Sequence, residues 1–350
     1  LFQSRGPIIT LRKESRFNWK VGPLTSKVQS NDTIHITQFI RGTRAALRAI
    51  TMLKSLLYFQ NRFHSNTSNC TPFEPFGNSS CAEKIHPPQN IIHMHLVCDR
   101  NLWTMLESQL QNCSLPYLKC SFYDVESYVN FAQRIPNGHI TGPTPVAKLW
   151  IPYILPPWVI KTIVPDSDML WNENPLMLWK IFEQFNPTQM IELAWEQQSY
   201  DPLCSEDQIK PLPSSGVNGG LVLMHLERMR NIRWDVTIEQ FIQLRLDQVG
   251  ILGEGEQEVY SFLIRMKPDW YYRIPCEWNT QVYSAVAVHC CPIIWPDRRP
   301  DVSHRCFDVA DNKSFVIGAL VHYDTPLKPE EPGWENSVVA GTPRSGDVLT

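Results

Sequence analysis

Residues 158–168 constrain the fold of this chain more than any other segment. They form an apolar, β-branched run that ends in two aspartates, Asp166 and Asp168. Such a run predicts a buried strand, and ligands bind at the carboxyl edge of open α/β sheets. Two hard oxygen ligands suit a divalent ion such as Mg²⁺ or Mn²⁺ held with a substrate diphosphate. Taken alone, the tripeptide Asp166-Ser167-Asp168 also fits a solvated turn after a strand.

Apolar runs alternate with amphipathic helical patterns along the rest of the chain. Strands are expected at residues 34–39, 91–98, 118–125, 189–194, 217–226 and 315–322, and the fifth of these is expected to be broken at Asn218-Gly219-Gly220. Helices are expected at residues 43–60, 102–110, 144–155, 175–185, 235–248 and 256–266. This alternation predicts an α/β protein with a mostly parallel sheet and helices on both faces.

Cysteine and sequon counts indicate an oxidising compartment. The chain has ten cysteines and six Asn-x-Ser/Thr sequons, which start at Asn31, Asn66, Asn69, Asn78, Asn112 and Asn312. Both features favour a secreted or lumenal protein. The first residue is Leu, so we expect that the natural start, with any membrane anchor, precedes it. A net charge of −3 without an extended basic run argues against a nucleic-acid partner.

The chain divides into three segments. Residues 1–30 are polar without a clear period and predict a stem or linker, and residues 329–350 predict a flexible tail rich in Pro and Gly. Residues 31–328 form the expected domain. Within it, residues 61–90 hold three sequons and predict a glycosylated insertion, for which a Cys70–Cys81 bridge is one possible pairing.

Further polar segments are candidates for chemistry, each with an ordinary structural alternative. His322 ends the last predicted strand and can complete a manganese site, and Lys328 can contact a diphosphate; alternatively both are surface side chains. Asn218 and Gly219 allow a ligand to approach the backbone closely, or they form a bulge or turn. Lys148 is a candidate on a helix, where a solvated lysine is the common case.

Acidic residues at 256 and 258 and a Cys/His-rich segment complete the candidates. Glu256-Gln257-Glu258 fits a helix N-terminus, where the helix dipole favours carboxylates. The Cys/His-rich segment comprises His289, Cys290, Cys291, His304 and Cys306. These residues can bind zinc, although disulfides are favoured in an oxidising lumen.

The order of these segments resembles glycosyltransferase family 8, and in particular the amino-terminal xylosyltransferase domain of the LARGE-type enzymes, over about residues 32–328. The matching motifs are His95-Leu-Val97, Ser121-Phe-Tyr123, Lys148-Leu149, Asp166-Ser-Asp168, Asn218-Gly-Gly-Leu221, Glu256-Gln-Glu258, Cys276-Glu-Trp-Asn-Thr-Gln281 and His322-Tyr-Asp-Thr-Pro-Leu-Lys328. The resemblance also implies a Cys276–Cys291 disulfide, since the second cysteine of the family's loop lies fifteen residues after the first.

The resemblance implies a GT-A fold, which is a Rossmann-like α/β architecture that binds nucleotide sugars. It also implies a retaining glycosyltransferase that uses Mn²⁺ and a UDP-sugar donor. The expected donor is UDP-xylose. The acceptor would be a glycan or glycoprotein, and the location the Golgi lumen, as a type II membrane protein. The implied metal ligands are Asp166, Asp168 and His322. The implied donor-binding residues are Lys148, Asn218, Gly219, Glu256 and Lys328, and Gln257 and Glu258 would lie at the reacting carbon.

Departures from the family pattern leave two further hypotheses. Both acids of the family's Asp-Gln-Asp are glutamates here, which moves each carboxylate by one methylene, and Asn-Thr-Gly has become Asn218-Gly-Gly. The family's Cys-Ala-Gly-Tyr-Asn loop reads Phe39-Ile-Arg-Gly-Thr43. The alternatives to an active enzyme are a catalytically impaired relative that binds glycans or partners, and a secreted scaffold that has kept the motifs without the activity.

Overall fold

A computed structural model gives the fold. It describes residues 15–17, 33–60, 90–112, 117–197, 212–213, 215–282, 291, 293–294, 316–325, 328 and 330–331. The predicted insertion at 61–90, apart from residue 90, and most of the stem and tail lie outside the described residues, as does the possible Cys70–Cys81 bridge. No helix among the described residues is long and apolar enough to cross a membrane.

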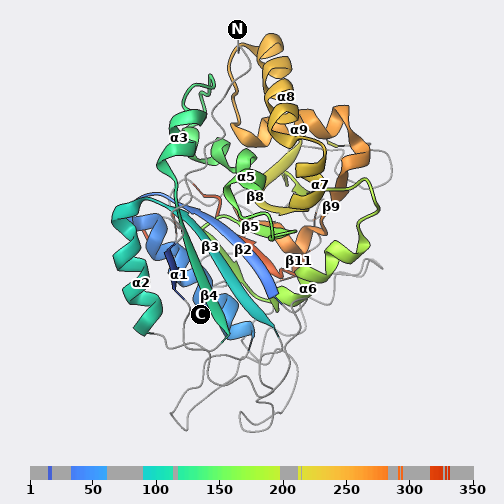
Figure 1. Cartoon of the computed structure of the whole chain (residues 1–350). Helices are drawn as coiled ribbons and strands as arrows, with labels where there is room; N and C mark the ends of the chain where they lie inside the picture. The colour runs from blue at the N-terminus through green and yellow to red at the C-terminus, as the bar shows by residue number, and fades with distance from the viewer. Residues whose placement is uncertain are drawn as a thin grey trace.

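The central element is an eight-stranded mixed sheet in the order β1-β4-β3-β2-β5-β8-β7-β9 (Figure 1). Its strands are β1 (Ser15–Phe17), β2 (Thr33–Ile40), β3 (Ile91–Cys98), β4 (Leu118–Asp124), β5 (Thr162–Pro165), β7 (Ile191–Trp195), β8 (Val217–Met224) and β9 (Tyr271–Arg273). All run in one direction except β1 and β8. The prediction of a mostly parallel sheet is therefore confirmed.

Helices cover both faces of this sheet, as the sequence pattern predicts (Figure 1). One face packs on α1 and α2, and the other on α3, α5 and α7–α9. The helices are α1 (Gly42–Phe59), α2 (Trp103–Asn112), α3 (Glu126–Ala132), α4 (Pro143–Val146), α5 (Ile151–Ile154), α6 (Pro175–Lys180), α7 (Leu226–Asn231), α8 (Trp234–Val249) and α9 (Glu256–Met266). The continuous helix expected at 144–155 is in fact α4, a 3₁₀ turn η3 (Ala147–Trp150) and α5, because Pro145 and Pro152 interrupt the helical hydrogen bonds.

The structure differs in detail from three of the strand predictions. β8 continues as one strand through Asn218-Gly219-Gly220, but its ladder with β7 is interrupted there: Leu193 pairs with Val222 and the next residue, Ala194, pairs with Asn218, so residues 219–221 of β8 have no partner on β7. The last predicted strand is two short strands, β12 (Val316–Ile317) and β13 (Leu320–His322), because the chain bends at Ala319, directly after Gly318. In addition, β5 begins only at Thr162, four residues later than the apolar run.

A second, three-stranded sheet lies at the carboxyl edge of the first, in the order β10-β13-β6. Its members are β10 (Thr280–Gln281), β13 and β6 (Met169–Trp171). β6 begins directly after Asp168 and pairs antiparallel with β13, so that His322 is the partner of Met169. This pairing carries the C-terminal part of the domain to the Asp-x-Asp turn, although more than 150 residues separate them in sequence.

Two short segments outside the predicted domain also make contacts. β1, which falls within the predicted stem, pairs antiparallel with β4 at the edge of the large sheet. Glu330 and Glu331, from the predicted tail, form ion pairs with Arg48 and Arg44 on α1. Both pairs are largely solvent-exposed, and ion pairs of this kind contribute little stability individually.

Candidate active site

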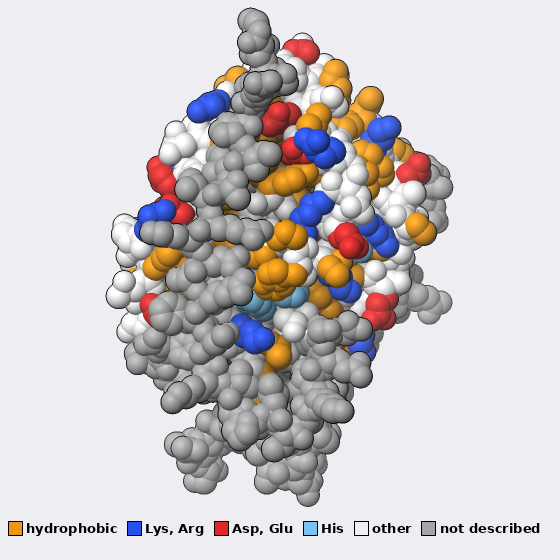
Figure 2. All heavy atoms as spheres, viewed as in Figure 1, with side chains coloured by type: hydrophobic (Ala, Val, Ile, Leu, Met, Phe, Trp, Pro, Cys, Tyr) orange, Lys and Arg blue, Asp and Glu red, His pale blue; other side chains and the backbone are white. Residues whose placement is uncertain are grey.

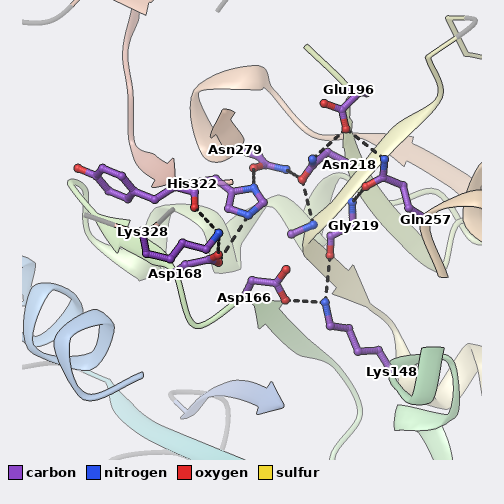
Figure 3. A network of polar contacts seen from close by, with 12 residues as sticks. Lys148, Asp166, Asp168, Glu196, Asn218, Gly219, Gln257, Asn279, His322 and Lys328 are labelled. Carbon is purple, nitrogen blue, oxygen red and sulfur yellow. Dashed lines mark hydrogen bonds and ion pairs between the residues drawn. The ribbon is translucent and has the colours of Figure 1, made fainter. Parts of the chain in front are cut away.

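The site forms where β5 ends and β8 begins. Because β8 is antiparallel to β5, its first residues lie beside the last residues of β5, with Pro165 paired to Leu221. The backbone amide of Asp166 donates to the carbonyl of Gly220 over 2.7 Å. Asn218 and Gly219 therefore lie beside Asp166 at the carboxyl edge of the sheet (Figure 3).

Three candidate metal ligands converge at this edge. Asp166, Asp168 and His322 each offer one ligand atom, and these atoms lie within 4.8 Å of one another. His322 Nε2 is 3.6 Å from Asp168 Oδ1. Two carboxylates and an imidazole are a donor set that suits Mn²⁺.

Two lysines contact the aspartates from opposite sides (Figure 3). Lys148 Nζ on η3 lies 2.5 Å from Asp166 Oδ1 and 3.3 Å from Glu256 Oε1, and Lys328 Nζ lies 2.7 Å from Asp168 Oδ2. Lys148 is buried, which by itself lowers its pKa, but Asp166 and Glu256 more than offset this and hold the pKa above its ordinary value. The ammonium groups thus provide fixed positive charge next to the carboxylates, where an anionic phosphate can be held.

A chain of amide side chains fixes the orientation of the His322 ring. Glu196 Oε2 accepts from Asn218 Nδ2 over 3.0 Å, and Asn218 Oδ1 accepts from Asn279 Nδ2 over 2.9 Å. Asn279 Oδ1 then faces His322 Nδ1 at 3.2 Å. A carboxylate can only accept, so each amide in the chain is oriented in turn and His322 Nδ1 carries the proton. The lone pair of Nε2 is left pointing toward Asp168, which is the tautomer that a metal ligand requires.

Gly220 leaves the space that the His322 ring occupies. A β-carbon at position 220 would lie 2.9 Å from His322 Nε2 and closer still to other ring atoms. Only glycine fits this position, because the imidazole packs directly on the strand backbone. The residues present therefore fit a divalent cation in three respects: the donor set, the tautomer and the space for the ring.

Gln257 connects the first turn of α9 to the same network. Its Oε1 accepts from the Gly219 amide over 2.9 Å, and its Nε2 donates to Glu196 Oε2 over 3.1 Å. Glu256 is buried and paired with Lys148. Both residues are thus drawn to the edge where Asp166 lies.

Glu258 is the one predicted site residue whose carboxylate has different partners. Its Oε1 accepts from Arg245 Nε over 2.8 Å, and its Oε2 accepts from the amides of Gly253 and Glu254. These contacts hold the carboxylate against α8 and the loop before α9. The other nine predicted site residues belong to a single network of polar contacts, which also includes Glu196 and Asn279. The hydrogen bonds of the Glu258 carboxylate do not reach this network.

Two members of the network, Glu196 and Asn279, were not assigned a role from the sequence. Asn279 lies in the Cys-x-Trp-Asn loop, η6 (Cys276–Asn279). The sequence shows this motif but does not indicate that Asn279 contacts His322. Glu196 follows β7 and had no spacing signal. The expected Cys276–Cys291 disulfide is present, with a Cα–Cα distance of 5.7 Å, and it closes the loop that carries Asn279. Cys291 is therefore not a zinc ligand, and the other members of that Cys/His-rich segment lie outside the described residues.

Replacing Asn279 tests the role of the amide chain. In Asn279→Leu, His322 Nδ1 loses its acceptor and the ring is free to change tautomer, so we expect Mn²⁺ affinity to fall about 10-fold. Isothermal titration of Mn²⁺ into the parent and the variant measures this. Equal affinities would show that Asn279 does not orient the ring.

The comparisons with known structures agree with this arrangement. Mouse xyloside xylosyltransferase 1, in its apo form, superposes with a TM-score of 0.57 at 17% identity, over 83% of this chain and 98% of that one. The galactosyltransferase LgtC, solved with donor and acceptor sugar analogs, superposes with a TM-score of 0.55 at 13% identity, over 87% of this chain and 94% of that one. The chain thus has the GT-A fold.

Sequence comparison identifies relatives of the chain. Mouse xylosyl- and glucuronyltransferase LARGE2 is 24% identical over 262 residues, which are 74% of this chain and 34% of that protein. Human LARGE2 is 24% identical over 309 residues, 88% of this chain and 36% of that protein. The chain is a homologue of the LARGE-type xylosyl- and glucuronyltransferases and spans about a third of their length. No protein-family model matches the chain.

Proposed function

We propose that the chain is a metal-dependent, retaining glycosyltransferase that transfers xylose from UDP-xylose to a glycan on a glycoprotein. The observation that carries the proposal is the convergence of Asp166, Asp168 and His322 between Lys148 and Lys328. The homology to xylosyl- and glucuronyltransferases supports the choice of sugar. Six sequons and the Cys276–Cys291 disulfide support a location in the secretory pathway, for which we propose the Golgi lumen.

Each group in the site has a role in this reaction. Asp166, Asp168 and His322 Nε2 would hold Mn²⁺, which supplies Lewis-acid stabilisation of the leaving UDP. Lys328 would bind a diphosphate oxygen in place of Asp168. Lys148, Asn218 and Glu256 would hold hydroxyls of the donor sugar, and Gly219 lets that sugar approach the β8 backbone. The Gln257 side chain, fixed by Gly219 and Glu196, would face the reacting carbon.

The test is release of UDP from a panel of UDP-sugars, including UDP-xylose, UDP-glucuronic acid, UDP-glucose and UDP-galactose, with and without Mn²⁺. We expect Mn²⁺-dependent release that is fastest with UDP-xylose. Folded protein that releases UDP from none of these donors would contradict the proposed activity. A parallel thermal-shift measurement with UDP and Mn²⁺ separates failure of donor binding from failure of turnover, because a bound ligand raises the melting temperature.

A second candidate, a weakly active glycan-binding relative, is favoured by one observation. The Glu258 carboxylate is held by Arg245 and two backbone amides, so its longer side chain is directed into structural contacts. A displacement of about 1 Å in a reacting group can cost about 100-fold in rate.

The double variant Glu256→Asp, Glu258→Asp distinguishes the two candidates. An impaired enzyme should gain about 10-fold or more in kcat for UDP release when the shorter carboxylates are restored. A chain adapted to glutamate should instead lose activity, because the shortened side chain at position 256 would no longer reach Lys148. Glu239→Asp, an exchange on the surface of α8, is the matched control and should change nothing.

A further inference from the structure

A second cluster of metal-ligating side chains lies on the large sheet, away from the Asp-x-Asp turn. It consists of His35 on β2 with His93 and His95 on β3. His35 and His93 are directly paired across the two strands, and His95 is two residues further along β3 on the same face. One nitrogen from each ring lies within 4.8 Å of the others. None of the three takes part in the proposed transfer.

The contacts of the rings are those of a ligand set. His35 Nδ1 and His95 Nε2 face each other at 3.0 Å, close to the separation of two nitrogens bound to one tetrahedral ion. The opposite nitrogen of His95 contacts the Tyr123 hydroxyl at 2.9 Å, and His93 Nε2 contacts the Ser121 hydroxyl at 2.9 Å. Metal-bound histidines almost always have the other ring nitrogen held in this way, which fixes the tautomer.

The surroundings keep these imidazoles neutral. Burial lowers the pKa of His35 to about 4 and that of His93 to about 3, so protons do not compete for the nitrogens near neutral pH. Lys119 and Lys161 contribute to the shift at His35 and also repel a cation. A hard ion bound mainly by charge is therefore disfavoured, and an ion that binds imidazole strongly is favoured.

One side of the cluster reaches the surface. His35 is only partly buried, and the indole of Trp158, which is half exposed, stacks on His93 at a centroid distance of 5.7 Å. Figure 2 shows histidine side chains emerging beside hydrophobic ones near the middle of the face in view. The partly exposed His35 is therefore the ligand nearest solvent, and Trp158 packs against all three imidazoles.

We propose that His35, His93 and His95 form a zinc-binding site with a water as the fourth ligand. His93 and His95 are stacked, with their planes 24° apart, so binding requires the His93 ring to tilt until its Nδ1 points toward the other two nitrogens, and the Ser121 hydroxyl follows Nε2. For both facing nitrogens to bind the ion, the N–H at the His35–His95 contact shifts to the other nitrogen of the same ring, so each imidazole stays neutral and no proton is lost. Such a site joins β2 to β3 and stabilises the sheet independently of sugar transfer.

Titration with Co²⁺, a spectroscopic substitute for Zn²⁺, tests the site in the full chain. We expect the intense visible bands of one four-coordinate Co²⁺, which Zn²⁺ displaces, and a Zn²⁺-dependent rise in melting temperature; a Co²⁺ held at the Asp-x-Asp turn by oxygen ligands absorbs only weakly. His35→Ala, at the partly exposed ligand, should abolish the bands. Tyr123→Phe, which keeps all three ligands, should weaken binding about 10-fold or more.

Two controls separate this site from the other possible ligands. Asp168→Ala removes the proposed Mn²⁺ site, and His139→Ala removes a histidine outside the cluster; both should keep the intense four-coordinate Co²⁺ bands of the parent, although Asp168→Ala loses any weakly absorbing Co²⁺ held at the Asp-x-Asp turn. Absence of Co²⁺ and Zn²⁺ binding, bands unchanged by His35→Ala, or thiolate-to-cobalt charge-transfer bands would each overturn the proposal.

Discussion

Asp168→Ala should abolish Mn²⁺-dependent UDP release, with kcat/KM falling at least about 1000-fold, which corresponds to ~4 kcal/mol of transition-state stabilisation. Asp168 is the residue on which the site converges, since His322 Nε2 and Lys328 Nζ both contact its carboxylate. Although burial raises its pKa, neighbouring positive charge, with Lys328 Nζ 2.7 Å from Oδ2, outweighs this effect and holds the pKa below its usual value. The carboxylate therefore remains ionised and available to a cation at neutral pH.

The fold should survive this change, because the backbone of Asp168, whose carbonyl accepts from Tyr323, is untouched. Circular dichroism and the melting temperature check that point. Asp235→Ala provides the matched control: this carboxylate is paired with Arg233 at the start of α8, outside the network, and its loss should leave UDP release at the parent rate. Equal activity of Asp168→Ala and the parent would remove the central support for a metal-dependent reaction.

Gly220→Ala should have the second largest effect. The added β-carbon would occupy the space of the His322 imidazole, and it is attached to a buried strand that cannot move away. The ring must therefore leave its position above β8. We expect Mn²⁺ affinity to fall about 100-fold and UDP release with it, because displacing one of three ligands costs at least as much as losing its orienting partner.

Gly138→Ala is the matched control for this experiment. A β-carbon there meets Ile251 Cδ1 at 3.4 Å, an ordinary contact, so Mn²⁺ binding should be unchanged. The double variant Gly220→Ala, His322→Ala adds a further check. If the alanine acts only through the ring, it should weaken binding no further once the ring has been removed. A parent-like Mn²⁺ affinity in Gly220→Ala would contradict the proposed ligand role of His322.

The sequence was sufficient to predict most strands of the large sheet. β3 is apolar at nearly every position because both of its faces are buried, and β2 alternates because one of its faces carries polar groups. The polar residues that follow β5 and β13 marked the site for the same reason: side chains at strand ends are placed by the sheet and not by their own packing. These local rules do not depend on distant residues.

The direction of β8 was not predictable in this way. An apolar strand has the same pattern whichever way it runs, and its direction follows from the connection that precedes it. Reversal of β8 is nevertheless what places Asn218 and Gly219 beside Asp166. Glu196 was missed for a related reason, since a single carboxylate after a strand acquires its role only when Asn218 and Gln257 reach it.

The histidine cluster is partly predictable from local sequence. His93 and His95 are two residues apart, which already places them on one face of a strand. His35 joins them only through the register of β2 against β3, which no local pattern specifies. A systematic pairing of predicted parallel strands, carried out for polar positions as well as apolar ones, would have found the triplet.

The hydrogen bond between the Asp166 amide and the Gly220 carbonyl has a consequence for how such enzymes diversify. It joins the turn that we propose holds the cation to the strand that we propose contacts the donor sugar, so a change that shifts either of them shifts both. Attempts to alter donor preference by random mutagenesis should therefore recover compensating pairs across the β5–β8 ladder more often than lone substitutions on either strand.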